Sequence, residues 1–253
     1  MRRALLLAVA TVCGAGALWL AAAGAGPSGA PAQSGSASPA VLARGRSLFQ
    51  ETCSSCHGLD GRGVTGRGPS LIGAGALAAH FYLSTGRMPL ADPSDAPVRT
   101  RPQFDDAQID ALVAYVAVRF GGPPIPPVDA AAGDLALGRR VFTEQCAGCH
   151  QVVGRGGVVV GGIAPPLQQA TPTQVAEAVR LGPYLMPRFT TAQVDQRELD
   201  ALARYVEWTK RPDDRGGWGI GNIGPIPEGM VAWLLGLASL LVVARLIGER
   251  ARR

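Results

Sequence analysis

The amino-acid sequence predicts an all-α protein with two tandem helical domains and a C-terminal transmembrane helix. Three observations lead to this fold class: an internal repeat, helical spacing of apolar residues in both copies of that repeat, and an uninterrupted apolar segment near the C-terminus. No segment alternates between apolar and polar residues in the way a half-buried strand does. We therefore expect helices to make up the folded part of the chain.

The repeat fills most of the chain between its two ends. GRSLFQETCSSCH (45–57) is matched by GRRVFTEQCAGCH (138–150), and FDDAQIDALVAYV (104–116) is matched by FTTAQV (189–194) followed by DALARYV (200–206). Low-complexity stretches rich in Gly, Pro and Ser separate the copies. The expected organisation is a signal peptide or signal anchor (1–26), a flexible linker (27–39), domain 1 (40–120), a Pro/Gly-rich connector (121–133), domain 2 (134–210), a stalk (211–228), a transmembrane helix (229–248) and a basic tail (249–253).

Each copy is expected to begin and end with a helix. Ser38 before Pro39 and Asp134 in the second copy are typical helix caps. The closing helices have an apolar face at i, i+3, i+4 and i+7. Those faces consist of Ile109, Leu112, Val113 and Val116 in copy one and Leu199, Leu202, Ala203 and Val206 in copy two. Capping boxes are predicted at Asp105 with Gln108 and at Thr190 with Gln193.

The two ends of the chain hold its excess of positive charge. The formal net charge of +5 comes from terminal arginines, and the remainder of the chain is balanced, which argues against nucleic-acid binding. Residues 4–26 are uncharged and resemble an export signal, in which Cys13 is interpreted as an apolar residue of the segment. Residues 229–248 are long enough to cross a bilayer, and the basic tail after them predicts a cytoplasmic C-terminus.

Two C-x-x-C-H motifs, at 53–57 and 146–150, are the strongest chemical pattern in the sequence. A zinc ribbon needs its Cys pairs closer together, and a redox C-x-x-C follows a strand, which is not predicted here. Neither site explains a histidine directly after each second cysteine. Covalent haem c does, since two thiols one turn apart reach the two vinyl groups and the imidazole reaches the iron. We therefore expect two covalently bound haem c groups, attached through Cys53, Cys56, Cys146 and Cys149, with His57 and His150 on the iron.

The other axial ligands are predicted by elimination among the four methionines. Met1 is the initiator and Met230 begins the apolar helix, which leaves Met88 and Met186, each followed by proline. A thioether opposite histidine is a known axial ligand and raises the reduction potential. His80 is the remaining candidate, and we interpret it as a surface or second-shell residue. The Gly-rich segments 61–66 and 153–162, which follow the two motifs, are interpreted as loops.

Each copy resembles a class I cytochrome c domain. The matching residues of copy one are Gly45, Phe49, Cys53, Cys56, His57, Pro69, Met88, Leu112 and Tyr115, and those of copy two are Gly138, Phe142, Cys146, Cys149, His150, Pro165, Met186, Leu202 and Tyr205. The resemblance implies that the glycine lets the first and last helices cross closely. It also implies that the carbonyls of Pro69 and Pro165 accept a hydrogen bond from the proximal imidazoles, which orients the rings.

The whole chain resembles a narrower family, the di-haem cytochrome c subunit of the actinobacterial quinol:cytochrome c reductase (cytochrome bcc complex). The motifs are GPSLIG (68–73), STGRMP (84–89), MPRFTTAQV (186–194) and GPIPEGM (224–230). The resemblance implies a respiratory electron carrier without a catalytic site of its own, anchored in membrane lipid with both haems outside the cytoplasm. Its implied partners are the cytochrome b and Rieske iron–sulfur subunits and the terminal oxidase subunit with the copper site, and the N-terminal haem is expected to be reduced first.

Two other functions remain open from the residues alone. A di-haem peroxidase also has two C-x-x-C-H motifs, but it needs one iron with an exchangeable position, which two methionine ligands would close. The cytochrome subunit of a periplasmic dehydrogenase would use the same chemistry with another electron donor. The predicted C-terminal anchor and the GPIPEGM segment favour the reductase.

Overall fold

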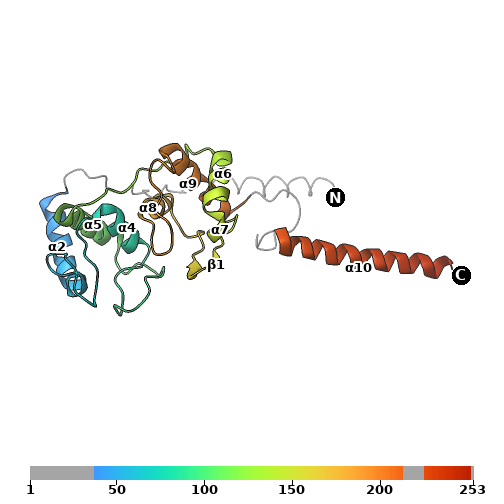
Figure 1. The fold of residues 1–253 in the computed structure, drawn as a ribbon, viewed down its shortest axis with the longest axis horizontal. Coiled ribbons are helices and arrows are strands. Elements are labelled where there is room, and N and C mark those ends of the chain that lie inside the picture. Colours follow the sequence, from blue (N-terminus) through green and yellow to red (C-terminus); the bar gives the residue numbers. More distant parts are fainter. Residues whose placement is uncertain (1–36, 213–224, 252–253) are drawn as a thin grey trace, which may run out of the picture. The chain divides into compact units, whose positions relative to one another are not determined.

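A computed structural model describes residues 37–212 and 225–251 of the chain (Figure 1). The predicted signal segment, most of the flexible linker and most of the stalk lie outside the described residues, so their interpretation stays a prediction. The described part is predominantly helical, as the sequence predicts.

Domain 1 contains four helices, of which the first and last form its framework. These are α2 (Pro39–Thr52), α3 (Ser54–His57), α4 (Gly75–Ser84) and α5 (Asp106–Phe120). Helix α2 packs against α5, and α4 packs against α5 from another side. The core between them contains Phe49, Leu112, Val116 and Phe120, each no more than 5% exposed. Burial of these large apolar side chains is the main force that holds the helices together.

Domain 2 repeats this framework with different loops. Its elements are α6 (Leu135–Gln145), α7 (Ala147–His150), β1 (Gly157–Val159), β2 (Gly162–Ala164), α8 (Pro172–Leu181) and α9 (Gln196–Lys210). Helix α6 packs against α9 as α2 does against α5, and α8 also packs on α9. Phe142, Leu199, Leu202, Tyr205 and Val206 are buried at the centre of its core.

A glycine at the same place in each repeat allows the first and last helices to approach closely. A Cβ atom on Gly45 would lie 2.1 Å from the carbonyl oxygen of Ala111, and one on Gly138 would lie 2.0 Å from that of Ala201. Real Cβ atoms are never found so near a backbone oxygen, so any side chain here would force the helices apart. The expected role of both glycines is confirmed.

Most of the predicted helix starts are confirmed by hydrogen bonds. The side chain of Ser38 accepts a bond from the backbone N–H of Val41, and Asp134 caps α6 in the same way. Asp105 and Gln108 form a full capping box at the start of α5. The apolar faces predicted for the two closing helices are buried.

The predicted start of the last helix in domain 2 is wrong. Thr190 and Gln193 form a hydrogen-bonded turn, and α9 begins later, behind a capping box of Asp195 and Glu198. Two capping patterns stand five residues apart in this segment, and only the second one leads into the residues that the core buries. Val194, which lies between the two patterns, is 1% exposed and fixes the turn against the core.

A short antiparallel hairpin in domain 2 also departs from the prediction of loops and helices alone. Val158 pairs with Ile163, and Val159 with Gly162. Gly161 adopts a φ of 84°, a conformation that favours glycine and closes the tight turn. The run of valines before this turn does not alternate with polar residues, so periodicity gave no indication of a strand.

Helix α10 (Pro225–Ala251) is the C-terminal helix and begins shortly before the predicted transmembrane segment. Within it, Gly229–Arg250 is long and apolar enough to cross a membrane. None of this 22-residue segment is buried against the rest of the described chain. Its leucine and valine side chains are largely exposed, which suits a lipid environment.

Candidate haem sites

Each C-x-x-C-H motif forms a single helical turn directly behind the first helix of its domain. Cys53 ends α2, and the N–H of His57 donates to the carbonyl of Cys53 over 3.0 Å. Cys146 ends α6, and the N–H of His150 donates to its carbonyl over 2.9 Å. The turn places the two cysteines of each motif close together, and all four thiols are free. Each domain therefore has two thiols and an imidazole on one helical turn, directly after its first helix.

A proline carbonyl orients the imidazole in each domain. His57 Nδ1 lies 2.8 Å from the carbonyl oxygen of Pro69, and His150 Nδ1 lies 3.1 Å from that of Pro165. Since the carbonyl can only accept, Nδ1 bears the hydrogen and Nε2 keeps its lone pair for a metal. Burial lowers the pKa of His150, partly offset by the bond to Pro165, so the ring is neutral. A neutral, oriented imidazole is the form that binds iron.

Cys53 and Cys146 are half-buried, in surroundings that disfavour the thiolate. Burial, with a smaller contribution from Cys149, raises the pKa of Cys146 to about 12. Burial raises the pKa of Cys53 as well. Reactive and metal-binding cysteines need a low pKa and a positive environment. Among residues 37–212 and 225–251, no three His, Cys, Asp or Glu side chains are grouped to hold a metal ion by themselves.

In domain 2 three of the four predicted haem-binding residues line one apolar cavity. The structure brings Met186 together there with Cys146 and His150 of the second motif, whereas Cys149 is exposed and is not part of the lining. The rest of the lining is apolar and comprises Phe142, Leu167, Val175, Ala178, Val179, Leu202 and Val206. An apolar lining that also contains an imidazole, a thiol and a thioether fits a haem, which these residues would hold.

In domain 1 the predicted ligands lie around the equivalent core. Cys53 and Met88 both pack against the cluster that contains Phe49 and Leu112. Next to Met88, the guanidinium of Arg87 stacks over Phe81 with its central carbon 5.0 Å from the ring centre. Its Nη1 is buried and has no hydrogen-bond partner among residues 37–212 and 225–251. An unpaired buried cation is costly, so this donor fits an anionic group such as a haem carboxylate.

Arg87 was not among the residues that sequence reasoning selected. Its position in domain 2 is occupied by Leu185, directly before Met186. A comparison of STGRMP with the LMP of the second copy shows that arginine replaces leucine before the methionine. It does not show that part of the arginine side chain is buried. Burial, together with the nearby charge of Arg99, lowers the pKa of Arg87.

His80 lies away from the surface and forms a contact that the sequence did not indicate. Its side chain is 17% exposed, and its Nδ1 lies 2.6 Å from Oε1 of Glu177 in domain 2. His80 therefore faces the second domain. The sequence predicts a surface or second-shell residue at this position.

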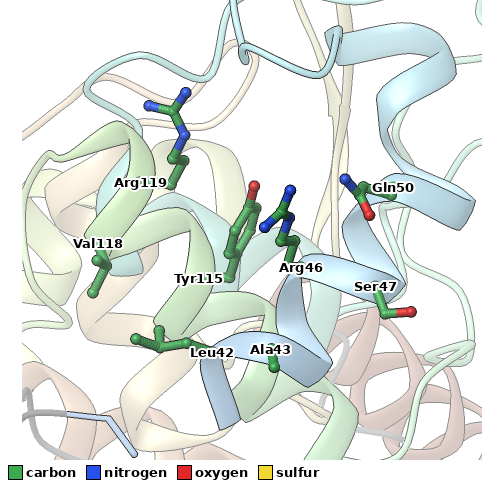
Figure 2. Close-up of a pocket in the computed structure, with 8 residues that line it drawn as sticks. All are labelled: Leu42, Ala43, Arg46, Ser47, Gln50, Tyr115, Val118 and Arg119. Carbon is green, nitrogen blue, oxygen red and sulfur yellow. The ribbon is translucent and has the colours of Figure 1, made fainter. Parts of the chain in front are cut away.

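A groove between α2 and α5 contains none of the predicted haem residues. Figure 2 shows Arg46 and Arg119 on either side of Tyr115. Its lining consists of Leu42, Ala43, Arg46, Ser47, Gln50, Tyr115, Val118 and Arg119. Because no cysteine, histidine or methionine reaches it, the groove is separate from the haem site of domain 1.

Comparison with known protein families gives a consistent result for both domains. Residues 42–118 match the cytochrome c family, and residues 133–206 match subunit III of the cbb3-type cytochrome c oxidase. The two matches fall on the two copies of the repeat. Two cytochrome c domains imply covalently bound haem c in each, which the paired cysteines of both motifs and the apolar cavity of domain 2 fit.

Curated relatives cover most of the chain. The cytochrome bc1 complex cytochrome c subunit of Mycobacterium tuberculosis (strain ATCC 25618 / H37Rv) is 39% identical over 223 residues, which cover 85% of this chain and 80% of the relative. The subunit of the same name from Corynebacterium diphtheriae is 35% identical and covers 84% of this chain and 82% of the relative. The cbb3-type cytochrome c oxidase subunit CcoP of an Azospirillum species is 31% identical over 66% of this chain and 61% of its own length. The chain is a membrane-anchored cytochrome c electron carrier and belongs to the family of cytochrome c subunits of the cytochrome bc1 complex.

Proposed function

We propose that this chain accepts electrons from a Rieske iron–sulfur subunit, which works with cytochrome b, and passes them toward the copper site of a terminal oxidase. The names of the relatives support a place in a bc1-type complex. The similarity to a cytochrome subunit of an oxidase supports a role on the path to oxygen. The bound haem groups supply the one-electron chemistry.

The residues we propose around each haem are those that the two motifs and the two methionines provide. Cys53 and Cys56 bind the first haem through thioethers, and Cys146 and Cys149 bind the second. The axial ligands are His57 with Met88 and His150 with Met186. Pro69 and Pro165 hold the two imidazoles in place through the hydrogen bonds described above.

The observation that supports this function most is the cavity that joins Cys146, His150 and Met186. His150 and Met186 would both hold the iron of a haem bound here, which would leave it no free coordination position. The apolar lining would keep water and polar substrates away from the metal. A closed site of this kind favours electron transfer and argues against a peroxidase, which needs a free coordination position.

We propose that both haem domains lie outside the cytoplasm and that the C-terminus lies in it. Helix α10 supports the anchor, and the arginines at its end favour the cytoplasmic side. A tethered carrier does not diffuse away, so its effective concentration at both partners is high. Domain 1 comes first in the electron path in this proposal. The proposal keeps the domain boundaries that the sequence predicts, at 40–120 for domain 1 and 134–210 for domain 2.

Purification from native membranes in mild detergent tests the proposed partners. We expect cytochrome b, a Rieske protein and oxidase subunits to co-purify with the chain. Recovery of a flavin or quinoprotein dehydrogenase in their place would overturn the assignment and favour the dehydrogenase alternative.

Carbon monoxide binding tests the closed iron sites. If Met88 and Met186 are ligands, the reduced protein binds carbon monoxide slowly and weakly, because sulfur must first leave the iron. Rapid binding at one of the two haems would contradict the ligand set and favour a peroxidase. The Met88→Ala and Met186→Ala variants serve as controls, since each opens one site.

A further inference from the structure

The two haem domains contact each other through α4 of domain 1 and α8 of domain 2. Gln174 on α8 donates from Nε2 to the carbonyl of Ser84 over 3.2 Å and to its hydroxyl over 3.1 Å. Arg99 of domain 1 donates to Gln174 Oε1 over 2.9 Å and to the carbonyl of Gln169 over 2.8 Å. These contacts form a specific polar interface, since each one needs both domains in a fixed arrangement.

One contact in this interface is different in kind, because both of its groups change charge with pH. His80 Nδ1 and Glu177 Oε1 are 2.6 Å apart, and the Glu177 side chain is 0% exposed. The second oxygen, Oε2, has no hydrogen-bond partner in the described structure. The polar contact of the Glu177 carboxyl with the protein is therefore made by a residue of the other domain. Separation of the domains would leave it solvated or unpaired.

The pair connects two helices that contribute to the two domain cores. Glu177 is followed on α8 by Ala178 and Val179, which line the cavity of domain 2. His80 is on α4, whose residues Ala76 and Leu83 belong to the core cluster against which Cys53 and Met88 pack. A contact between these helices therefore joins elements that support the two proposed haem sites.

We propose that His80 and Glu177 form a titratable latch, which holds the two domains in one arrangement and so sets the rate of electron transfer from one haem to the other. This inference rests on the proposed function as an electron carrier. In this step one electron leaves the first iron, which is oxidised, and reaches the second iron, which is reduced. His80 and Glu177 are positioning residues: they hold the two domains in place and do not bind the iron.

The charged surroundings determine how the latch responds to pH. Burial lowers the pKa of His80, but the hydrogen bond and charge of Glu177 outweigh this, helped by Asp110 and Asp106 of α5, so the pKa is raised overall. Burial raises the pKa of Glu177, and His80 opposes this in part. Arg99 bonds to Gln174, one turn before Glu177, and adds a permanent positive charge nearby.

Both shifts mean that the closed interface holds protons more tightly than the separated domains do. Linkage then requires that a rise in pH weakens the interface. The contribution of His80 is complete below its ordinary value of 6.5 and disappears as the pH rises through its raised pKa. The contribution of Glu177 has the same sign, since its raised pKa also favours the protonated form. The latch should be closed in mildly acidic medium and open in alkaline medium.

Distance measurement on the complete di-haem protein in detergent tests the latch directly. Dipolar EPR between the two oxidised irons is recorded at pH 6 and pH 9 for the wild type, His80→Gln, Glu177→Gln and a control. The control is Glu207→Gln, which makes the same change on α9 in a pair with Lys210 that stays within domain 2. We expect a narrow distance distribution in the wild type and the control at pH 6, which broadens at pH 9. His80→Gln leaves the buried Glu177 carboxylate without its charged partner and should be broad at both values, whereas Glu177→Gln, which is uncharged like the protonated carboxyl, should give a distribution that does not change with pH.

Flash-induced electron transfer between the haems gives the functional readout. In the wild type and the control the rate should fall roughly tenfold between pH 6 and pH 9, the order expected if the closed fraction falls from nearly all to about a tenth. In both His80→Gln and Glu177→Gln the rate should be independent of pH, and in His80→Gln it should also be slow. The exchange variant His80→Glu with Glu177→His should recover the pH dependence, which a purely structural role would not predict. Haem content of two per chain confirms that each variant has folded.

The outcomes distinguish failure of the latch from failure of the proposed function. A distance distribution that does not change with pH in the wild type overturns the latch, and so does a latch variant that keeps the wild-type profile. A normal latch in a protein that receives no electrons from a quinol-oxidising complex would instead overturn the proposed function.

Discussion

The two haem domains share their helix crossing and their histidine support, and they differ in what surrounds the methionine. Gly45 and Gly138 meet the backbone of the closing helix at almost the same distance, and a proline carbonyl holds each imidazole. Beside Met88 lies a half-buried arginine, whereas Met186 follows an exposed Tyr184 and Leu185 near the β1–β2 hairpin. The helix crossing and the support of the histidine are therefore the same in both copies, and the surroundings of the methionine differ.

Loss of the cysteines tests the independence of the two domains and should have the largest effect. In Cys53→Ala with Cys56→Ala, domain 1 loses its covalent haem, because no thiol remains to bind the vinyl groups. The denatured protein should retain one haem per chain, measured by its pyridine haemochrome spectrum. The matched variant Cys146→Ala with Cys149→Ala should also retain one. Loss of both haems from either variant would show that the domains do not mature separately.

Addition of a methyl group at the helix crossing tests whether the shared framework is equally tight in both domains. Gly45→Ala and Gly138→Ala should each destabilise their own domain by about 3 kcal/mol or more, because the helices must move apart. Thermal unfolding followed at the haem absorbance should show one transition lowered and the other unchanged. If both transitions moved together in either variant, the two domains would unfold as one unit.

A change of axial ligand tests whether the two methionines have equal roles. Met88→His should lower the reduction potential of the first haem by on the order of 0.1 V, since a nitrogen ligand favours the oxidised iron. Met186→His should do the same for the second haem. Spectroelectrochemical titration of each variant measures the two potentials. An unchanged potential in either case would show that the methionine does not bind the iron.

Exchange of the residue before each methionine tests whether the charge of Arg87 makes the two haem potentials differ. Arg87→Leu, which copies the residue of domain 2, should lower the potential of the first haem by roughly 40 mV, the equivalent of about 1 kcal/mol for one electron. The positive charge of Arg87 disfavours the oxidised iron, so its removal favours oxidation. Leu185→Arg is the reciprocal variant and should shift the second haem upward. A shift of the wrong sign would refute an electrostatic role for Arg87.

The exposed hairpin should give the smallest effect on the protein itself. Val160 is 100% exposed, so Val160→Thr should change the free energy of unfolding by less than about 0.5 kcal/mol. Electron delivery to a co-purified oxidase should nevertheless slow, if this apolar tip meets the acceptor. Val118→Thr, at an exposed valine of domain 1, is the matched control for oxygen consumption. Equal rates in both variants would exclude the hairpin from the docking surface.

The parts of this structure that the sequence predicts well are those fixed by near neighbours. Ser38, Asp134 and the Asp105–Gln108 box act within one helical turn, and the C-x-x-C-H turn is local as well. The start of α9 was misplaced because Thr190–Gln193 and Asp195–Glu198 satisfy the same local pattern, and only burial in the core selects between them.

Contacts between distant residues left no pattern in the sequence. His80 and Glu177 are 97 positions apart, and neither lies in a repeated motif. The unpaired nitrogen of Arg87 becomes evident only when its surroundings are known. The valines of the hairpin lack alternation, and their pairing depends on the turn at Gly161. Such features can be recognised only in the folded structure, since their energy comes from groups that are distant in the sequence.

The groove between α2 and α5 also shows where the chain enters and leaves domain 1. Leu42, near the beginning of α2, and Val118, near the end of α5, line the same groove (Figure 2). Entry and exit therefore lie side by side at the α2–α5 groove, which contains none of the proposed haem residues. A gene fusion can therefore add a second domain after α5 without inserting residues between the proposed iron ligands of the first.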